Sequence, residues 1–463
     1  MTAPATSAPA DLDLDQLRDR FGGEAFGPSD PAWDVARGAW NLAVDQHPAA
    51  VALPESAADV AAAVNFAREA GLRVSVQGTG HNAAAYGSLE DVLLIKTERM
   101  RGVEIDPVAH IARVEAGVTW GEVVAPAAEH GLAALAGSSH DVGVVGYTLG
   151  GGVSFLARKH GLACERVTAI EVVTADGELR RATADEETDL FWALRGGGGN
   201  FGVVTAMEFS LLPLTEVYAG ALFFPFERAG EVLEAWRRWS TGVPDEVTSI
   251  GRLLQFPPIP EIPEMLRGRS FAVVEAVYLG SEERGQELLA PLRELGPAMD
   301  TFAMTGPEGL LALHMDPPGP VPGRGDHQML ADLDAAAVES LVEAIGPGTD
   351  SVLVSFEFRH LGGALSGRRE GSGAVGSLDG RYMTFGVGML AVPEMEAPLV
   401  ASLARAREAL DVVDSGSHFS NFAEFEVEPD SIYGERTLKR LREIKDAVDP
   451  DGLMNGNHAI AAA

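Results

Sequence analysis

Residues 76–82 read Val-Gln-Gly-Thr-Gly-His-Asn, residues 143–152 read Gly-Val-Val-Gly-Tyr-Thr-Leu-Gly-Gly-Gly, and residues 196–202 read Gly-Gly-Gly-Gly-Asn-Phe-Gly. These three segments decide the fold, because each is expected to be a loop that brings its backbone close to a ligand. Glycine allows such an approach and lets successive N–H groups point at anionic oxygens. Three such loops within about 130 residues predict one extended ligand that carries phosphate groups.

The first loop also matches the dinucleotide fingerprint G-x-G-x-x-A, with Glu98 about 20 residues further on. Its surroundings argue against a nicotinamide-binding Rossmann site. Only fifteen residues separate the strand expected to end at Val76 from the one expected to begin at Val92, so a crossover helix barely fits. The run 196–199 follows a helix and precedes a strand, which is the reverse of a P-loop. An NAD(P)-dependent dehydrogenase and three purely structural turns remain as alternatives.

Around these loops, apolar runs of strand length alternate with helical segments up to about Pro213, which predicts an α/β or α+β lobe. From Tyr218 to about Asp411, longer strands pair with amphipathic helices, a pattern typical of an antiparallel sheet backed by helices. Segments 257–263 and 317–326 are expected to be Pro/Gly-rich loops. The expected strands are 51–54, 72–76, 92–95, 112–116, 167–174, 203–211, 221–226, 271–279, 352–358 and 382–390, and the expected helices are 56–70, 120–130, 187–195, 230–239, 283–295, 335–345, 398–410 and 435–448.

The composition narrows the class of protein. A chain of 463 residues exceeds what one hydrophobic core usually fills, so two lobes are expected. The formal net charge of −33 argues against nucleic-acid and membrane partners and is typical of a protein kept soluble in a high-salt or high-GC host. Cys164 is the single cysteine, and we find no signal peptide and no apolar stretch of about 18 residues, so we expect a cytoplasmic protein. No histidines have metal-ligand spacing and no G-x-S-x-G motif occurs, so we expect no metal site and no hydrolase.

The glycine loops, the run 189–205 and the closing segments 433–450 and 455–458 resemble the berberine bridge enzyme-like branch of the vanillyl-alcohol oxidase / p-cresol methylhydroxylase superfamily. The resemblance is dense over 49–214 and 433–460 and thin between them. It implies an α+β, two-lobe FAD-binding fold of the PCMH type. The implied parts are an N-terminal lead-in (1–45), an FAD-binding domain (46–214), a substrate-binding domain with an antiparallel sheet backed by helices (215–429), and a C-terminal segment that completes the FAD lobe (430–463).

The resemblance implies that His81 is bonded to the flavin 8α-methyl group. Many members carry a second link from a cysteine four residues before the glycine that matches Gly143, but Ser139 stands there in this chain. A single link is therefore expected, as in bacterial members such as the 6-hydroxy-D-nicotine oxidases; an unlinked histidine above a noncovalent flavin stays open. The implied cofactor-binding residues are His81, Gln77, Gly78, Thr79, Gly80, Asn82, Tyr86, Gly87, Gly137, Ser138, Ser139, Val142, Gly143, Gly146, Tyr147, Gly150, Gly151, Gly152, Gly202, Val203, Val204, Asn455 and Asn457, with the pyrophosphate on 78–82 and 137–139 and the isoalloxazine ring near 142–146 and 150–152.

The catalytic residues are less clearly marked. Sugar and alcohol oxidisers of the family place a tyrosine base two residues before an asparagine, and here Phe419 precedes Asn421, so another group must serve or the substrate needs no strong base. Strand periodicity sends Ser355, Glu357 and Arg359 to one face. The nicotine oxidases have a lysine and a glutamate at the first two of these positions, which makes nicotine itself doubtful. Glu357, Tyr382 and Asn421 are the catalytic candidates; the alternatives are a surface ion pair for Glu357 and a strand tyrosine with a satisfied hydroxyl for Tyr382, and His360 and His418 are weaker options.

The resulting hypothesis is an FAD-linked oxidoreductase that oxidises a secondary alcohol, carbohydrate, amine or specialised metabolite. Hydride passes from a substrate C–H bond to flavin N5, and dioxygen or another acceptor reoxidises the flavin, giving hydrogen peroxide in the case of dioxygen. The alternatives are a flavin-binding protein without oxidase turnover and, less favoured, the NAD(P)-dependent dehydrogenase.

Overall fold

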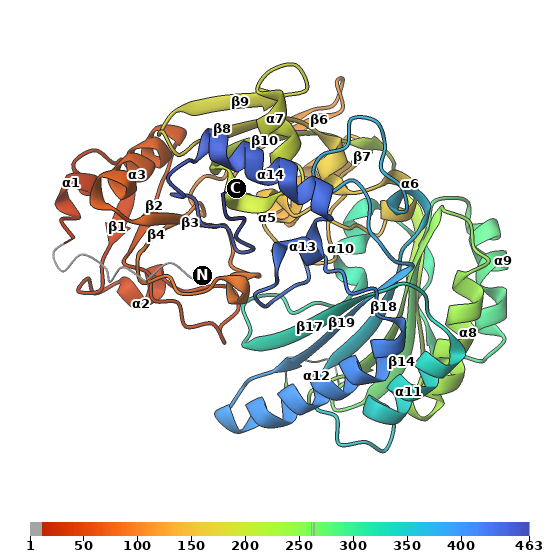
Figure 1. Ribbon diagram of the computed structural model, residues 1–463. Coiled ribbons are helices and arrows are strands. Elements are labelled where there is room, and N and C mark those ends of the chain that lie inside the picture. The colour runs from red at the N-terminus through yellow and green to blue at the C-terminus, as the bar shows by residue number, and fades with distance from the viewer. Residues whose placement is uncertain (1–11, 261, 263, 463) are drawn as a thin grey trace.

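Two sheets in the N-terminal half and one large sheet in the middle of the chain organise the protein (Figure 1). The computed structural model describes residues 12–260, 262 and 264–462, so the first part of the predicted lead-in, residues 1–11, lies outside the described residues. Among the described residues, no helix combines the length and the apolar character that crossing a bilayer requires.

The first sheet has the strand order β1 (Glu24–Phe26), β2 (Ala50–Leu53), β4 (Val92–Lys96) and β3 (Arg73–Gln77). β2 and β3 both run parallel to β4, because helix α3 (Ala57–Ala70) returns the chain from β2 to β3. The predicted helix is confirmed with its ends: the Ser56 side chain accepts the Asp59 N–H, and Gly71 adopts a left-handed φ of 70°. Strand β1 lies in the segment 1–45 that was expected to be an N-terminal lead-in, and its pairing with β2 makes this part of the segment a member of the first sheet.

The second sheet is antiparallel, with the order β5 (Val103–Asp106), β6 (Ile111–Glu115), β10 (Val203–Ser210), β8 (Val167–Val173) and β9 (Leu179–Thr183). Its edge strands β5 and β9 are partly exposed and were not expected. Helices α4 (Trp120–Ala128) and α7 (Thr188–Leu194) confirm two predictions. The segment 143–152 is only partly a loop, because it contains helix α5 (Val144–Leu149).

The C-terminal segment returns to these two sheets. Helix α14 (Glu435–Val448) buries Leu438, Leu441 and Ile444 in the hydrophobic core that also holds residues of α5 and α7. Beyond it, Met454 forms a parallel bridge with Val74 of β3. Figure 1 shows this segment, in dark blue, lying against the first sheets although the large sheet separates them in sequence. The precise limits of the four predicted parts stay a prediction.

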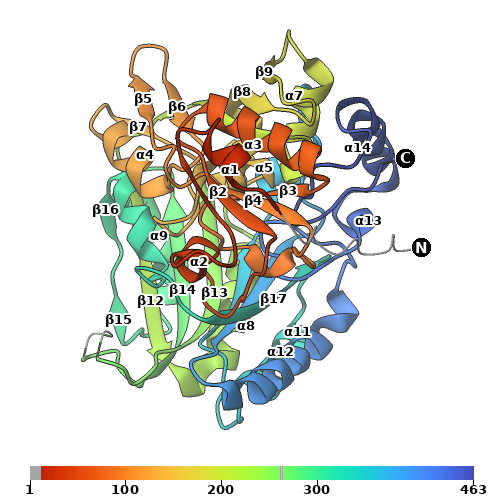
Figure 2. The same cartoon turned by 90° about the vertical axis from the view of Figure 1, so that its left-hand side faces the viewer.

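The large sheet is antiparallel and covered by helices on one face (Figures 1 and 2). Helices α8 (Ala229–Ser240), α9 (Glu282–Arg293), α11 (Ala335–Ile345) and α12 (Glu396–Leu410) confirm the predicted backing helices. The strand order is β15 (Met299–Asp300), β12 (Val217–Pro225), β14 (Ser270–Tyr278), β13 (Val247–Gln255), β18 (Ser355–His360), β19 (Tyr382–Met389) and β17 (Gly323–Leu330), with β16 (Ala303–Thr305) also paired to β12.

Two strands of this sheet depart from the sequence-based expectation. β13 was not expected, and β17 begins at Gly323, inside the segment 317–326 that was expected to be a loop. β17 reads Gly-Arg-Gly-Asp-His-Gln-Met-Leu, which lacks the alternation of polar and apolar residues that marks a strand. Its pairing with β19 over eight residues stabilises the extended conformation that the local sequence does not indicate. The shorter elements are α1 (Asp15–Arg18), α2 (Trp33–Ala36), α6 (Ala157–His160), α10 (Leu310–Leu313), α13 (Pro429–Ile432), and the paired strands β7 (Leu132–Ala133) and β11 (Leu212–Pro213).

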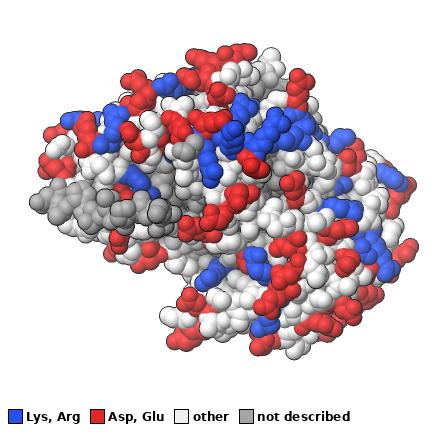
Figure 3. Space-filling view, in the orientation of Figure 1, with Lys and Arg blue, Asp and Glu red and all other residues white. Residues whose placement is uncertain are grey.

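Charged side chains of both signs are interspersed on the face seen in Figure 3, with acidic ones spread over the whole view. This distribution accords with the net charge of −33. Many basic residues on the surface are neutralised locally, as for Arg181 with Glu208 at 2.8 Å and Arg440 with Asp189 at 2.8 Å.

Candidate active site

The three glycine-rich loops lie together. A Cβ built on Gly143 would have Thr79 of the first loop as its nearest neighbour, at 3.7 Å. Asn457 donates a hydrogen bond to Asn82 at 3.2 Å, and a Cβ built on Gly198 would lie 4.0 Å from the same Asn457. The fold therefore brings the loops at 76–82, 143–152 and 196–202 and the C-terminal segment to one place.

Several glycines of these loops face open space, which is the cradle that a dinucleotide flavin requires. A Cβ built on Gly146 or Gly199 would meet no atom within 4 Å, and the buried Gly143 would meet none closer than 3.7 Å. Among the described residues, Gln77 Oε1 and His458 Nδ1 are buried without a hydrogen-bond partner. An open backbone beside unpartnered polar atoms suits a polar, phosphate-bearing ligand, so the residues present fit FAD.

Three glycines at the end of the second loop are closely packed against neighbouring side chains. A Cβ on Gly150 would lie 2.7 Å from Asn421, one on Gly151 would lie 3.0 Å from the Phe419 ring, and one on Gly152 would lie 2.3 Å from the Tyr147 ring. These three glycines are explained by the close approach of the segment 419–421 and of the tyrosine ring.

His81 contacts three side chains, although its buried Nε2 makes no hydrogen bond among the described residues. Its Nδ1 lies 2.8 Å from the Thr79 hydroxyl, and its Nε2 lies 3.3 Å from a carboxylate oxygen of Asp141. Its ring stacks on Trp40 with the ring centres 4.0 Å apart. Asp141 also accepts hydrogen bonds from Ser139 at 2.7 Å and from the Trp40 indole at 2.5 Å. Burial would raise the pKa of Asp141, but the adjacent His81 and the hydrogen bonds from Ser139 and Trp40 hold it well below its usual value.

The remaining predicted cofactor residues divide by what their side chains contact. Tyr86 and Tyr147 donate their hydroxyls to backbone carbonyls at 2.6 and 3.1 Å, and Asn455 donates to Ser75 at 2.8 Å, so these side chains support the loops. Gly202 is explained by packing, because a Cβ there would lie 2.6 Å from the Val173 carbonyl oxygen. The side chains of Val203 and Val204 are buried in the core, which leaves only their backbone for a ligand, and Gly78, Gly80, Gly87, Gly137, Ser138 and Val142 all lie in or beside the converging loops.

A cluster of buried charged side chains lies on the face of the large sheet that adjoins these loops. It consists of Arg252, Glu275, His314, Glu357 and Arg359. Glu357 lies 2.6 Å from Arg359 and 2.8 Å from His314. Glu275 lies 2.6 Å from His314 and 3.0 Å from Arg252. The hypothesis of a surface ion pair for Glu357 is wrong, because that side chain is only 1% exposed.

The ionisation of the cluster follows from its contacts. Burial would raise the pKa of Glu357, but Arg359 and His314 hold it well below its usual value. Burial and Arg252 would lower the pKa of His314, but Glu275, Glu357 and Asp316 raise it to about 9. At neutral pH the cluster therefore contains two carboxylates, two guanidiniums and an imidazolium.

A polar contact connects the cluster to the segment 137–141, whose Asp141 lies beside His81 of the first glycine loop. The Ser138 hydroxyl donates to Asp316 at 2.8 Å, and the other Asp316 oxygen lies 4.0 Å from His314. Arg359 also lies over the Phe422 ring, 4.9 Å from its centre, next to Asn421. The cofactor loops and the charged face of the sheet therefore adjoin.

Tyr382, one of the three catalytic candidates, does not face the cofactor loops, so that candidate is wrong. Tyr382 pairs with His360 of β18, which lies one residue out of phase with Glu357 and Arg359 and so on the opposite face. Its ring is fully buried against Trp236 of α8, and its hydroxyl lies 2.9 Å from Ser240. The alternative, a strand tyrosine with a satisfied hydroxyl, is what the structure has.

Asn421 lies in the site with both ends of its amide engaged. Its Oδ1 accepts the Gly152 N–H at 3.2 Å, and its Nδ2 donates to the Tyr147 carbonyl at 3.0 Å. Asn421 thus fixes the end of the second loop. Phe419 is buried beside it, with 2% of its surface exposed, and carries no group that could exchange a proton.

Several residues of the site were not predicted from the sequence. Glu275 stands inside an apolar run, which is a signal for a buried charge, and Arg252 lies on the strand β13 that was not expected. His314 and Asp141 carry no local signal, because partners 39 to 60 residues away define their surroundings. Glu424 was also missed; it accepts the Gly325 N–H at 3.0 Å, and burial raises its pKa to about 7.

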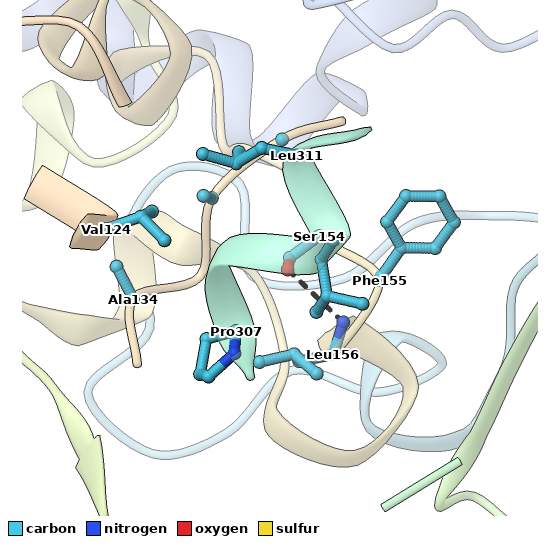
Figure 4. A pocket seen from close by; sticks show the side chains of 10 residues that line it. Val124, Ala134, Ser154, Phe155, Leu156, Pro307 and Leu311 are labelled. Carbon is cyan, nitrogen blue, oxygen red and sulfur yellow. Dashed lines mark hydrogen bonds between the residues drawn. The ribbon is translucent and has the colours of Figure 1, made fainter. Parts of the chain in front are cut away.

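A small cavity beside α4 and α10 is separate from the charge cluster (Figure 4). Its lining is apolar except for Ser154, whose hydroxyl accepts the Leu156 N–H at 3.2 Å. No charged side chain lines it, so it offers no chemistry of its own. Among the described residues, no group of three or more His, Cys, Asp or Glu side chains could hold a metal ion.

Comparison with known proteins agrees with this geometry. The family model described as FAD binding domain matches residues 48–183. The (R)-6-hydroxynicotine oxidase of Paenarthrobacter nicotinovorans is 39% identical over 192 residues, which is 42% of this chain and 42% of that protein. An uncharacterised FAD-linked oxidoreductase of Bacillus subtilis, YvdP, is 29% identical over 453 residues, covering 93% of this chain and 96% of that protein.

Solved structures extend the likeness to the whole chain. The berberine bridge enzyme-like protein 1 of Physcomitrella patens superimposes with a TM-score of 0.84 at 20% identity, covering 97% of this chain and 99% of that one. The 6-hydroxy-D-nicotine oxidase of Arthrobacter nicotinovorans has a TM-score of 0.78 at 25% identity, covering 95% and 98%. The sequence matches to the first relatives span 42%, 60% and 38% of those proteins' lengths.

Fold and loops together define a two-lobe FAD-binding protein of the PCMH type, which confirms the predicted fold class. Within that class the chain is similar to the berberine bridge enzyme-like FAD-linked oxidoreductases, in sequence to the relatives above and in fold over nearly its whole length.

Proposed function

We propose that the chain carries FAD bonded through His81 and uses it to oxidise a small organic substrate, with dioxygen as the electron acceptor. One observation carries the proposal: the segment 137–141, whose Asp141 lies beside His81, adjoins the charge cluster of the large sheet through the contact of Ser138 with Asp316 at 2.8 Å. A flavin held by these loops would have titratable groups on its substrate side.

FAD would supply a hydride acceptor at N5 and a route for two electrons to dioxygen. The chain's own residues would bind and orient. Backbone N–H groups of 78–82 and 137–139 would hold the pyrophosphate, and 142–146 would support the ring. Glu357, kept ionised by Arg359 and His314, would accept a hydrogen bond from the substrate hydroxyl or amine, and Asn421 would hold the loop that the ring rests on.

The substrate class we propose is an alcohol, a carbohydrate, an amine or a specialised metabolite. Relatives of this chain are named for 6-hydroxynicotine, glucooligosaccharides and xylooligosaccharides. Ser355 is neutral and accepts a hydrogen bond from Arg252 at 2.7 Å. Because the nicotine oxidases have lysine there, 6-hydroxynicotine itself is not proposed.

The test begins with acid precipitation of the purified protein. A yellow pellet, together with a flavin-mass adduct on the peptide that contains His81, would support the linkage, and His81→Ala should give a colourless pellet. Oxygen consumption is then measured with a panel of alcohols, sugars and amines. Flavin without oxygen uptake on any of them would favour the flavin-binding protein without turnover, and a colourless protein that shifts NADH fluorescence would favour the dehydrogenase.

We also propose that the protein acts in the cytoplasm. The single cysteine, Cys164, is buried and can form no disulfide within the chain. Fractionation of the producing cells with an antibody to the chain would test the location.

A further inference from the structure

The carboxylate of Asp141, beside His81, is held in place by hydrogen bonds to both of its oxygens. Its carboxylate accepts hydrogen bonds from the Ser139 hydroxyl at 2.7 Å and from the Trp40 indole at 2.5 Å. Its side chain is 19% exposed, and the hydrogen bonds keep it ionised. A carboxylate fixed in this way can only accept, so it imposes a donor on any group that faces it.

His81 faces that carboxylate with one nitrogen and a hydroxyl with the other. Nε2 lies 3.3 Å from Asp141 Oδ1, and Nδ1 lies 2.8 Å from Thr79 Oγ1. A hydroxyl can donate or accept a hydrogen bond, whereas an ionised carboxylate can only accept one and so favours a protonated nitrogen opposite it. The carboxylate 3.3 Å from Nε2 therefore favours the neutral tautomer with its proton on Nε2, and this tautomer leaves the lone pair on Nδ1 toward the Thr79 hydroxyl.

Trp40 completes the arrangement. Its ring stacks on the imidazole at 4.0 Å with an angle of 19° between the planes, and its backbone N–H donates to the Thr79 carbonyl at 2.9 Å. The same residue thus fixes the plane of His81, the position of the loop that carries it, and one oxygen of Asp141.

We propose that Asp141 is the positioning residue that makes His81 the site of flavin attachment, an inference that rests on the proposed function. Attachment replaces one hydrogen of the flavin 8α-methyl group by Nδ1 of His81. A C–H bond and an N–H bond break, a C–N bond forms, and the two protons and two electrons reduce dioxygen to hydrogen peroxide. Asp141 orients the Nε2 proton while Nδ1 forms the bond and stabilises the imidazolium that results, whose Nε2 proton then passes to solvent, as a carboxylate stabilises a histidine in other nucleophilic sites.

The experiment compares covalent and noncovalent flavin in the full-length protein. Asp141→Asn keeps the oxygen that accepts from Trp40 and places an amide where Oδ1 stood. The amide can donate to the Ser139 hydroxyl, so the loop stays folded, but it is neutral and cannot stabilise an imidazolium. Apoprotein is mixed with FAD in air, and samples are withdrawn over time for the absorbance of acid-precipitated protein and for the mass of the His81 peptide. We expect FAD to bind to the variant with unchanged affinity and the covalent adduct to form about 100-fold more slowly.

Glu208→Gln is the matched control, because Glu208 is a partly buried carboxylate paired with Arg181 at 2.8 Å, remote from the loops. It should attach flavin at the wild-type rate. Attachment at the wild-type rate in Asp141→Asn would overturn the role of Asp141 but leave the covalent linkage to His81 standing. Absence of an adduct in the wild-type protein would instead overturn the covalent linkage and this inference with it. A variant that loses both FAD affinity and thermal stability would show that Asp141 only holds the loop, which also overturns the inference.

Discussion

His314 lies with its Nε2 2.8 Å from a carboxylate oxygen of Glu357, in the buried centre of the large sheet. The other nitrogen of the ring meets Glu275 at 2.6 Å. With a carboxylate at each nitrogen, the ring is held as an imidazolium, and its pKa is raised to about 9 although burial and Arg252 would lower it. The charge of Glu357 therefore depends on a residue that no local motif marks.

This arrangement predicts that stability falls as the pH rises from about 6.5 to about 9. Histidine in the unfolded chain has a pKa of about 6.5. The stabilisation by protonated His314 is therefore complete below that pH and is lost as the pH rises through the folded-state value of about 9. His314→Gln should unfold about 3 kcal/mol more easily at pH 6 and should show a flatter pH dependence. Thermal unfolding at pH 6, 7.5 and 9 measures both, with the exposed His130→Gln as the control; an unchanged slope in His314→Gln contradicts the assignment.

Two glycines of the second loop should respond differently to a methyl group. Gly152 has a φ of 75°, and its Cβ would lie 2.3 Å from the Tyr147 ring, so Gly152→Ala should cost about 3 kcal/mol of unfolding free energy. Gly143 has a φ of −66°, and its Cβ would meet nothing closer than 3.7 Å, so Gly143→Ala should fold normally.

If the open side of Gly143 is where the flavin lies, Gly143→Ala should weaken FAD binding by about tenfold while its apoprotein melts at the wild-type temperature. Calorimetric titration of apoprotein with FAD and a melting curve without FAD measure the two effects separately. Wild-type affinity in Gly143→Ala would place the flavin elsewhere.

The fold could be predicted where local signals agree with the tertiary structure. Capping residues mark both ends of the helix from Ala57 to Ala70 in the sequence. The alternation over 355–359 correctly places Ser355, Glu357 and Arg359 on one face of the sheet. β17 could not be predicted, because a run with two glycines and an aspartate becomes a strand only through its partner β19.

The site was harder to predict because it depends on contacts between distant segments. Alternation shows which residues share a face, but which face meets the FAD lobe is set by the pairing of strands; the register that places Tyr382 opposite His360 sends its ring to the helices. The same holds for Asp141, which reaches His81 across 60 residues, and for His314, which reaches Glu275 across 39.

Ionisation of Glu424 should make the protein less stable as the pH rises from about 4.3 to about 7, a lower range than that of His314. Burial raises its pKa to about 7, and the single N–H of Gly325 offsets this only in part. Glutamate in the unfolded chain has a pKa of about 4.3, so the folded state is favoured most below that pH and loses stability up to about pH 7. Glu424→Gln should remove this dependence and stabilise the protein by about 2 kcal/mol at pH 8. Urea unfolding at pH 5 and pH 8 tests it against Glu426→Gln, an exposed neighbour; equal stabilities of wild type and Glu424→Gln at pH 8 would refute it.

Tyr382 and Glu357 lie on adjacent strands but on opposite faces of the sheet, so their removal should have different consequences. Tyr382→Phe loses the contact with Ser240 and should cost about 1 kcal/mol of stability while the rate of flavin reduction by substrate stays unchanged. Glu357→Gln removes the carboxylate that faces the cofactor loops and should slow flavin reduction by about 100-fold at unchanged flavin content.

Anaerobic stopped-flow absorbance with a substrate from the oxygen-uptake panel measures both rates, and melting curves confirm that each variant is folded. Slow reduction in Tyr382→Phe would return that residue to the catalytic site, and wild-type reduction in Glu357→Gln would leave the charge cluster a structural role only.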